Sequence, residues 1–425
     1  MAKLTPQFET LPNGLQLVLV DLPGFHSVTN FLVIRSGSRY ENKKNNGIAH
    51  FLEHMVFKGT QKYPDTLAVA QAIEGVGGYF NAWTANDHTA YWNTVPSAAW
   101  QTGVTVPFEL AFRALLRPED LERERGVIIE EIRRMKDDPA SFVDELLGPI
   151  LFPNNQLGQS VIGSEENIQK MTIEQFEDYR AKYYHPGQAL FIAVGDIGQK
   201  DIKAEVLKQT ESLTPRAITL PKPFIGPSQT SLNFYHKETD QTHFQVAVVD
   251  QDLASHGKDE YTGIVLNAVL GRGMSSRLFL NIREKKGLAY SISSSFQSFE
   301  DTGLITVSGG VNTAKIAQTL EALDAEFASL RDELVGDEEL AKAKALICGS
   351  FDLSSDRPVD LAMWYGTDRL LGEAEDFETA KKNVQAVTAE QIRLLAKRLL
   401  VKDRQVLAVI GPYKDDSIFK KFLGK

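Results

Sequence analysis

Residues 213–231 read LTPRAITLPKPFIGPSQTS, and this stretch divides the 425-residue chain almost into halves. It has few periodically spaced apolar residues, and its prolines are Pro215, Pro221, Pro223 and Pro227. Proline-rich segments are typical of domain boundaries, where few contacts cross from one domain to the next. We therefore expect an N-terminal domain over residues 1–214, a linker over residues 215–230 and a C-terminal domain over residues 231–425.

The two sides of this linker have similar patterns, which indicates an internal duplication. Each has an alternating strand run, a helix, a second group of strands, more helices and a short apolar strand that ends in glycine. The expected strands are residues 14–20, 31–34, 79–95 and 189–195 in the first half, and 244–249, 290–299, 303–308 and 406–411 in the second. Helical patterns between them cover residues 67–75, 172–184, 314–330 and 388–400. This order favours an α+β fold of two similar, duplicated domains, each with a mainly antiparallel sheet packed with helices.

The composition narrows the possible classes of function. The chain has 46 basic and 56 acidic residues, so its formal charge is 46 − 56 = −10. This acidic balance, with no dense basic tract, argues against nucleic-acid binding, which relies on basic surfaces that neutralise phosphates. Cys348 is the single cysteine. A metal site in this chain must therefore use histidines and carboxylates.

Targeting and membrane signals are not recognisable in the sequence. The first residues, MAKLTPQ, lack the apolar core of a signal peptide and the arginine-rich, acid-poor character of a transit peptide. No run of about 18 apolar residues is present, so we expect no membrane span. These features predict a cytoplasmic protein of a bacterium.

The stretch most informative about chemistry is GIAHFLEHMVFKG, residues 47–59, a helical pattern that ends at a glycine. His50 and His54 lie one turn apart, so both imidazoles project from the same helix face and can bind one ion. Glu53 flanks that face, where a carboxylate can take a proton from water in metal-assisted peptide hydrolysis. This is the inverted metalloprotease motif His-x-x-Glu-His. The alternative is a solvent-facing helix on which the histidines and the glutamate simply pair.

A third metal ligand is expected from residues 121–136, LERERGVIIEEIRRMK. Val127 and Ile128 mark the apolar face of this helix, and Glu124 and Glu131 fall on the same face. Acids on an apolar face are expensive to bury unless they pair or bind metal. We assign Glu131 as the ligand and Glu124 as a supporting carboxylate that orients a histidine or the water. The alternative is a surface helix with ion pairs such as Glu130 to Arg134.

Taken together, these residues make the chain resemble the pitrilysin/insulinase family of inverted-motif zinc peptidases, within it the short bacterial branch similar to mitochondrial processing peptidase. The likeness covers nearly the whole chain. Besides the two helices, it rests on GGYFNA at residues 77–82, followed by Asp87 and Tyr91, and on residues 273–290, which hold GMSSRL and GLAY. The resemblance implies two duplicated α+β domains per chain, and paired chains that close like a clamshell around a chamber for unfolded peptide.

The resemblance also implies roles for individual residues. His50, His54 and Glu131 resemble the ligands of one zinc ion per chain, Glu53 the general base and Glu124 the supporting carboxylate. Asn81 and Ala82 resemble the edge strand on which substrate docks, where unpaired backbone groups can accept any extended peptide. Their alternative is an ordinary strand interior.

Arg283 and Tyr290 resemble the family residues that reach the substrate backbone and stabilise the oxyanion, a task suited to guanidinium and hydroxyl donors. Arg283 falls in the last turn of a helical run that ends at Gly287, and Tyr290 on the strand that follows. In the alternative, Arg283 complements the helix C-terminus and Tyr290 packs with its hydroxyl exposed.

The function expected from these residues is that of a zinc metalloendopeptidase that hydrolyses short or unfolded peptides. Because one chain holds both the zinc motif and the Arg283/Tyr290 pair, a homodimer is the simplest active form. A heterodimer with a related chain that lacks the zinc motif is a further possibility. The rival reading is a non-catalytic structural or peptide-holding subunit of a larger complex. A chain of that kind would lack some of the expected metal ligands, whereas this chain has all three and the general base.

Overall fold

The computed structural model describes residues 5–372 and 374–425, which form two compact units. Unit 1 comprises the described residues up to Arg133, Gln159–Lys222, and the described residues from Ser354 to Ala374. Unit 2 comprises Arg134–Gly158, Pro223–Leu353 and Glu375–Lys425. One of the points at which the chain passes from unit 1 to unit 2, between Lys222 and Pro223, lies inside the expected linker.

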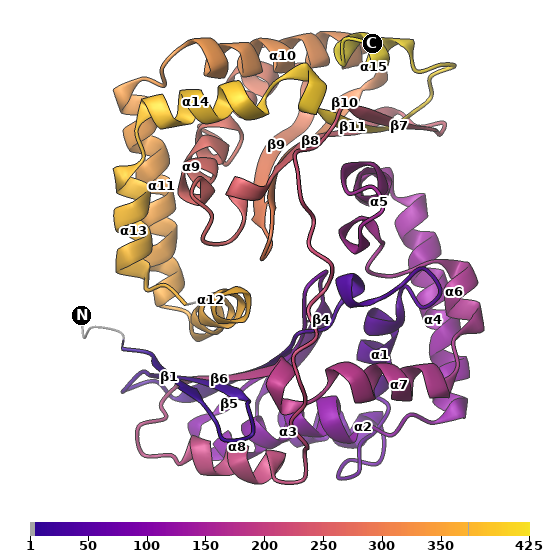
Figure 1. The fold of residues 1–425 in the computed structure, drawn as a ribbon, viewed down its shortest axis with the longest axis vertical. Helices are drawn as coiled ribbons and strands as arrows, with labels where there is room; N and C mark the ends of the chain where they lie inside the picture. Colours follow the sequence, from indigo (N-terminus) through magenta and orange to yellow (C-terminus); the bar gives the residue numbers. More distant parts are fainter. Residues whose placement is uncertain (1–4, 373) are drawn as a thin grey trace. The chain divides into compact units, whose positions relative to one another are not determined.

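Unit 1 is built on a six-stranded sheet with the order β1-β2-β6-β3-β5-β4 (Figure 1). Its strands are β1 (Gln7–Thr10), β2 (Gln16–Asp21), β3 (Ser27–Ile34), β4 (Tyr79–Thr84), β5 (Thr89–Pro96) and β6 (Ala189–Gly195). Its helices are α1 (Ile48–Val56), α2 (Thr66–Glu74), α3 (Trp100–Arg113), α4 (Pro118–Asp137, whose last residues belong to unit 2), α6 (Glu165–Lys170), α7 (Ile173–Tyr183), α8 (Ile202–Thr210) and α12 (Pro358–Leu371).

Unit 2 is built on a five-stranded sheet with the order β7-β11-β8-β10-β9. Its strands are β7 (Ser231–His236), β8 (Gln241–Asp250), β9 (Ala289–Ser298), β10 (Gly303–Asn312) and β11 (Val406–Gly411). Its helices are α5 (Pro139–Leu151), α9 (Glu260–Leu270), the π-helix η6 (Leu278–Lys285), α10 (Ile316–Asp332), α11 (Asp337–Ser355, whose last residues belong to unit 1), α13 (Phe377–Ala386), α14 (Ala389–Leu399) and α15 (Ser417–Phe422).

The two sheets have the same topology, which confirms the expected α+β class with two similar halves. In unit 1, β6 lies between β2 and β3 and runs parallel to β2. In unit 2, β11 lies between β7 and β8 and runs parallel to β7. All other neighbouring pairs are antiparallel. Strand β1 is an addition to unit 1. Strands β4 and β9 occupy equivalent places, each at a free end of its sheet.

One helix in each unit comes from the opposite half of the sequence. Helix α12 follows most of unit 2 in the chain, yet it packs on β6 and β3 of unit 1. There Gly366 lies so close to the sheet that a Cβ on it would be 2.5 Å from Cδ1 of Ile192. Helix α5 precedes the linker, yet it packs on β11 and β8 of unit 2. In continuous domains over residues 1–214 and 231–425, α5 would belong to the first domain and α12 to the second. In the structure, α5 belongs to unit 2 and α12 to unit 1.

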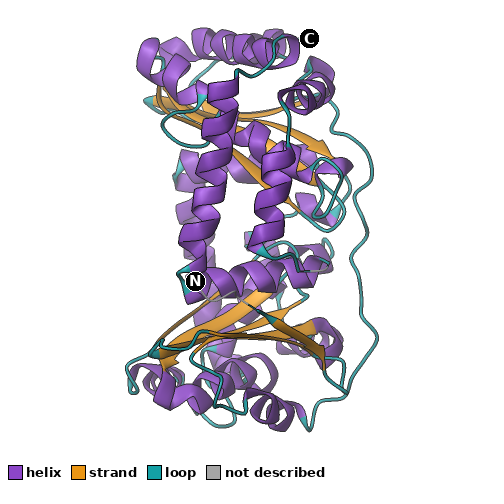
Figure 2. Ribbon diagram, turned by 90° about the vertical axis from the view of Figure 1, so that its left-hand side faces the viewer, coloured by secondary structure: helices purple, strands orange, loops and turns teal. Residues whose placement is uncertain are grey.

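Both sheets bury apolar side chains on both faces, and Figure 2 shows the helices that cover them. In unit 2 the buried residues alternate along each strand: Val246 and Val248 face one cluster, whereas Ala247 and Val249 face the side chains of α5. In unit 1, α3 packs on β3 and β5. Across residues 5–372 and 374–425, the structure has no helix of the length and apolarity needed to cross a membrane.

Candidate metal centre

Helix α1 presents its polar residues on one side because its apolar residues are spaced for burial on the other. Ile48, Phe51, Leu52 and Met55 follow the spacing i, i+3, i+4, i+7, and all four are buried in the unit 1 core. His50, Glu53 and His54 fall between these positions and are half-buried. The helix begins after Gly47, whose φ of 99° lies in the left-handed region that favours glycine. The core packing of α1 thus determines the side on which His50 and His54 lie.

Helix α4 brings the two expected carboxylates to this face. Leu121, Ile128 and Ile132 are buried, and Glu124 is buried with them. The assignment of Val127 to the apolar face is wrong, because its side chain is 50% exposed. Helical rotation places position 127 beside that face, while Ile128 lies one turn from both Glu124 and Glu131. Glu124 and Glu131 both lie within reach of His54.

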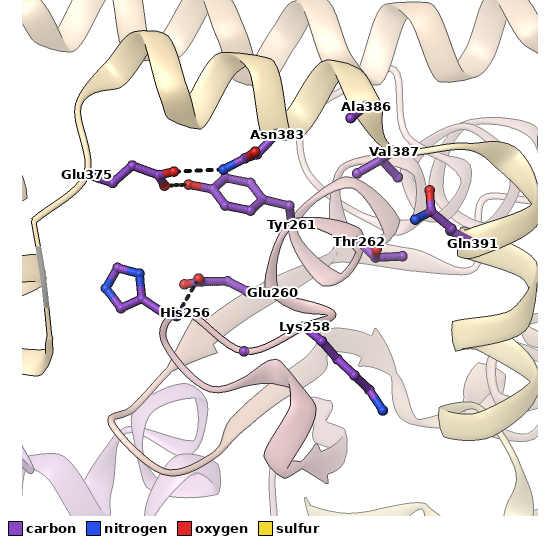
Figure 3. A pocket seen from close by; sticks show the side chains of 11 residues that line it. His256, Lys258, Glu260, Tyr261, Thr262, Glu375, Asn383, Ala386, Val387 and Gln391 are labelled. Atoms are coloured by element: carbon purple, nitrogen blue, oxygen red, sulfur yellow. Dashed lines mark hydrogen bonds between the residues drawn. The ribbon is translucent and has the colours of Figure 1, made fainter.

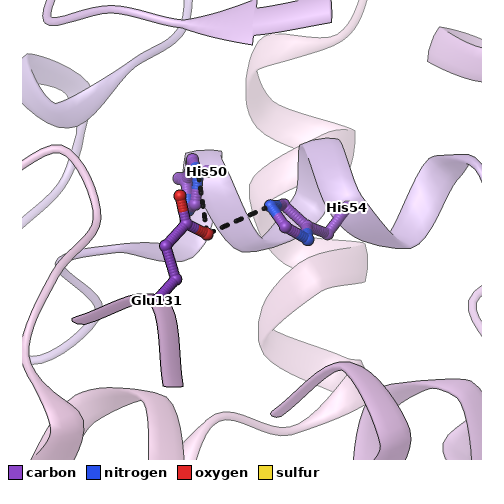
Figure 4. A group of neighbouring side chains, drawn as sticks. All are labelled: His50, His54 and Glu131. Atoms are coloured by element: carbon purple, nitrogen blue, oxygen red, sulfur yellow. Dashed lines mark ion pairs between the residues drawn. The ribbon is translucent and has the colours of Figure 1, made fainter. Parts of the chain in front are cut away.

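The three expected ligands come together in unit 1 (Figure 4). Nε2 of His50 lies 4.0 Å, and Nε2 of His54 lies 3.7 Å, from Oε2 of Glu131. One ligand atom from each of the three side chains falls within 4.8 Å of the others. Zinc binds histidine nitrogens and carboxylate oxygens at about 2.0–2.2 Å in tetrahedral geometry, so ligand atoms around one ion are about 3.3–3.6 Å apart. The donor set fits one metal ion, and the atoms lie somewhat farther apart than around a bound ion.

Glu124 orients one of the histidines. Nδ1 of His54 donates to Oε2 of Glu124 at 3.2 Å, which in the neutral ring leaves the lone pair on Nε2, the nitrogen that faces Glu131. Lys58 donates to the other oxygen of Glu124 at 2.6 Å. Nδ1 of His50, by contrast, is buried without a hydrogen-bond partner among the described residues. These contacts are those that a supporting carboxylate would make, whereas the role of Glu124 itself stays a prediction.

The electrostatics of the group differ between the two histidines. Burial, together with the charge of His54, lowers the pKa of His50 to about 4, so His50 is neutral and able to bind a cation at neutral pH. Burial alone would lower the pKa of His54, but the neighbouring carboxylates Glu124, Glu53 and Glu131 outweigh it and raise that pKa. The carboxylates therefore favour positive charge at His54, whereas burial keeps His50 neutral.

Glu53 faces the same group from the side of β4. Burial raises the pKa of Glu53, opposed by a hydrogen bond from Thr84 and by the charge of His54. The Thr84 hydroxyl donates to Oε2 of Glu53 at 2.6 Å and so fixes one carboxylate oxygen. Sequence reasoning missed Thr84. No spacing relates the end of a strand at residue 84 to a helix at residue 53; only the packing of α1 on β4 does.

Asn81 and Ala82 lie on β4, the strand at one end of the unit 1 sheet. Asn81 is exposed, and the backbone amide of Ala82 donates to Oδ1 of Asn81 at 2.9 Å. The outer side of an edge strand has no neighbouring strand in the sheet, so an extended peptide can pair with its backbone there. The position on an edge is what peptide docking requires, whereas the docking itself stays a prediction.

Arg283 and Tyr290 belong to unit 2 and lie outside the metal group. Arg283 is in the last turn of η6, with its guanidinium 4.8 Å from the ring centre of Phe279. Tyr290 lies on the edge strand β9, and 76% of it is exposed. The helix, the glycine at 287 with φ 58° and the following strand occur as expected. The catalytic roles of the two side chains stay predictions.

Unit 2 also contains a polar pocket of about 370 Å³ at the start of α9 (Figure 3). Tyr261 donates to Glu375, and Asn383 donates to the other oxygen of Glu375 at 2.7 Å. Glu260 accepts from the backbone amide of His256 at 2.7 Å. These polar groups bond to one another, and the residues that line the pocket are not those of the metal group.

The chain is similar to known proteins over nearly its whole length. Residues 16–165 match the family model described as Insulinase (Peptidase family M16), and residues 170–347 match that of the Peptidase M16 inactive domain. An uncharacterized zinc protease of Bacillus subtilis is 32% identical over 405 residues, which cover 95% of this chain and 97% of that protein. An uncharacterized zinc protease of Streptomyces coelicolor is 31% identical over 418 residues, which cover 96% of this chain and 89% of that protein.

Two solved structures have the same fold. A protease from Helicobacter pylori superposes with a TM-score of 0.91 at 22% identity, over 96% of this chain and 100% of that one. A peptidase M16 inactive domain from Pseudomonas fluorescens superposes with a TM-score of 0.88 at 21% identity, over 96% and 99%. At these identities the superpositions establish the fold alone.

Proposed function

Because the chain belongs to the insulinase family of peptidases, family M16, we propose that it is a zinc-dependent endopeptidase of short or unfolded peptides. The observation that carries this proposal is the convergence of His50, His54 and Glu131, with Glu53 beside them. The name "inactive domain" attaches to residues 170–347, which contain none of these four side chains. It therefore does not favour a non-catalytic subunit.

His50, His54 and Glu131 would hold one zinc ion per chain. Zinc in such a site supplies Lewis acidity, which polarises the scissile carbonyl and makes water a stronger nucleophile near neutral pH. Two histidine nitrogens and one carboxylate oxygen are a common protein donor set for catalytic zinc. In the chain itself, α1 and α4 keep the donors within one ion's reach before the metal arrives.

Glu53 is the proposed general base. Its raised pKa makes the carboxylate a better proton acceptor than an exposed glutamate, and the Thr84 hydroxyl leaves one oxygen free to face the reacting water. Glu53 accepts the proton of the attacking water and then passes it to the leaving amine nitrogen. The substrate would add to β4 as a further strand along Asn81 and Ala82, which recognises backbone and not side chains.

The proposed active form is a homodimer. In this proposal Arg283 and Tyr290 donate to the oxyanion that forms on the substrate, in a site completed by the partner chain. Mixing inactive His50→Ala protein with inactive Arg283→Ala protein should then restore activity through subunit exchange. Mixed dimers that form but do not cleave would refute the composite site.

The test of the proposed function is cleavage of a quenched, basic peptide of about 15 residues by wild type and by Glu53→Gln, with zinc content measured on the same samples. We expect both to hold zinc and only wild type to cleave. Glu130→Gln, on the exposed face of α4, is a matched control that should retain both properties. Wild-type protein that holds no zinc would refute the proposal.

A further inference from the structure

The start of α1 depends on a side chain that lies outside the helix. Gly47 is the N-cap residue and offers no side chain to bond the free amides of the first turn. Glu41, which is buried, supplies the missing acceptors from six residues upstream. Its Oε2 accepts from the backbone amide of Gly47, and its Oε1 from that of Ala49, each at 2.8 Å.

The same carboxylate also holds the turn that leads into the helix. Nδ2 of Asn46 donates to Oε2 of Glu41 at 2.8 Å and to the carbonyl oxygen of Ser160 at 2.7 Å. On the opposite side, a Cβ on Gly163 would lie 2.6 Å from Cα of Gly47, so the backbones touch. The turn is therefore held between Glu41 and the segment at residues 160–163, without room to shift.

We propose that Glu41 is a positioning residue of the metal centre: its two oxygens place the first turn of α1, and through it His50, within reach of Glu131. Ala49, one of its two backbone partners, directly precedes His50. This inference rests on the proposed zinc site and assigns Glu41 no contact with substrate or metal.

The chemistry of the contact requires a carboxylate. Three donors converge on Glu41, and only an ionised carboxyl offers two oxygens that both accept. A glutamine of the same shape would turn an NH2 group toward at least one of these donors. The negative charge also offsets the positive end of α1, which would otherwise disfavour a cation at His50. Burial raises the pKa of Glu41 to about 7, opposed by the three hydrogen bonds that it accepts, so the carboxyl is fully ionised only above neutral pH.

Glu109 is a matched control, because it is a second buried carboxylate of unit 1 with similar contacts elsewhere. It accepts from the Thr60 hydroxyl at 2.9 Å and from the backbone amide of Lys62 at 3.1 Å, and it pairs with Arg113. Glu109→Gln therefore removes the same charge and the same kind of hydrogen bond away from α1. Any effect that both variants share reflects loss of a buried carboxylate in general.

The experiment compares Glu41→Gln, Glu109→Gln and wild type in full-length protein by competition for zinc with a chelator and by the visible spectrum of bound Co²⁺. We expect Glu41→Gln to bind zinc about 10- to 100-fold more weakly, as is typical when a residue that supports a ligand is lost, and to change the Co²⁺ spectrum. Glu109→Gln should match wild type in both. Zinc binding by Glu41→Gln within twofold of wild type, with an unchanged Co²⁺ spectrum, would overturn the inference.

Two further results keep this inference separate from the proposed function. Wild-type protein without zinc affinity would overturn the zinc site itself, whereas equal affinities in wild type and Glu41→Gln would overturn only the role of Glu41. If Glu41→Gln does not fold, Glu41→Asp tests the same claim. The aspartate keeps the charge but is one methylene too short to reach both amides, so weaker zinc binding is again expected, and unchanged binding would refute the role.

Discussion

Replacing Glu124 by glutamine tests how the protein holds the lone pair of His54 toward the metal position. Glutamine has the same shape and can still accept from Nδ1 of His54, but it carries no charge. Its amide group would then face the ammonium of Lys58, which donates at 2.6 Å to the second oxygen of Glu124. The contact to His54 is weakened, and the contact to Lys58 is lost.

The size of the effect follows from these two contacts. A hydrogen bond to a charged group contributes about 1.5–3 kcal/mol and a neutral one about 0.5–1.5 kcal/mol. The substitution therefore weakens the hydrogen bond that orients His54 by about 1–1.5 kcal/mol. Lys58 can turn to solvent, so its loss adds little. Since about 1.4 kcal/mol is a factor of ten, we expect zinc affinity to fall roughly tenfold. Loss of the charge also lowers the pKa of His54, which weakens proton competition and opposes the fall.

The assay is a chelator competition at pH 8.5, well above the usual histidine range, where proton competition is small for both proteins. Glu130→Gln is the control on the same helix: it removes an exposed pair with Arg133 and should leave zinc affinity unchanged. Equal zinc affinity of Glu124→Gln and wild type would refute the reasoning that Glu124 orients His54 for the metal.

Three further predictions concern stability and substrate. Removal of zinc should lower the melting temperature by roughly 5–10 °C relative to protein with zinc at a hundredfold excess over Kd, because binding at that excess adds about 2.7 kcal/mol to the free energy of unfolding. Calorimetry with and without chelator checks this, and the melting temperature of His54→Ala should not shift. Burial lowers the pKa of His88 to about 4. On acidification the unfolded state therefore binds a proton at this histidine before the folded state does, and the free energy of unfolding should fall by about 2 kcal/mol between pH 7 and pH 5 because of His88. His88→Gln, which keeps an acceptor for the indole of Trp83, should lose that part of the pH dependence in urea unfolding, and an unchanged slope would contradict it. Ala82→Pro removes an edge amide and should raise KM about 3- to 10-fold with zinc content and kcat unchanged, as expected for one backbone hydrogen bond; an unchanged KM would argue against docking on β4.

The parts of the fold that the sequence predicts are those with local periodicity. The strands at residues 189–195 and 406–411 match β6 and β11, because a short apolar run bounded by glycine has few other conformations. His50 and His54 could be paired from helical spacing alone, and Glu131 from the acids on the next amphipathic helix. The error at Val127 arises because neighbouring positions on a helix differ by about 100°, so one residue can lie outside the buried face.

The parts that could not be predicted depend on contacts between distant segments. Thr84 supports Glu53, and Glu41 caps α1, only because strand and turn pack against that helix. The exchange of α5 and α12 is likewise invisible to a pattern read along the chain. Each of the two helices has an ordinary apolar face, and its sequence does not indicate which of the two sheets that face covers.

The exchanged helix α12 imposes an order on the synthesis of the protein. Every strand of the unit 1 sheet has been made once Gly195 leaves the ribosome, but the helix that covers β6 and β3 follows only at residues 358–371. Until then, a growing chain carries a nearly complete sheet with an apolar face open to water, a species prone to aggregation. A fragment that ends at the linker keeps that exposed face permanently. We therefore expect the first half, expressed alone, to need the second half, supplied in trans, before it becomes soluble.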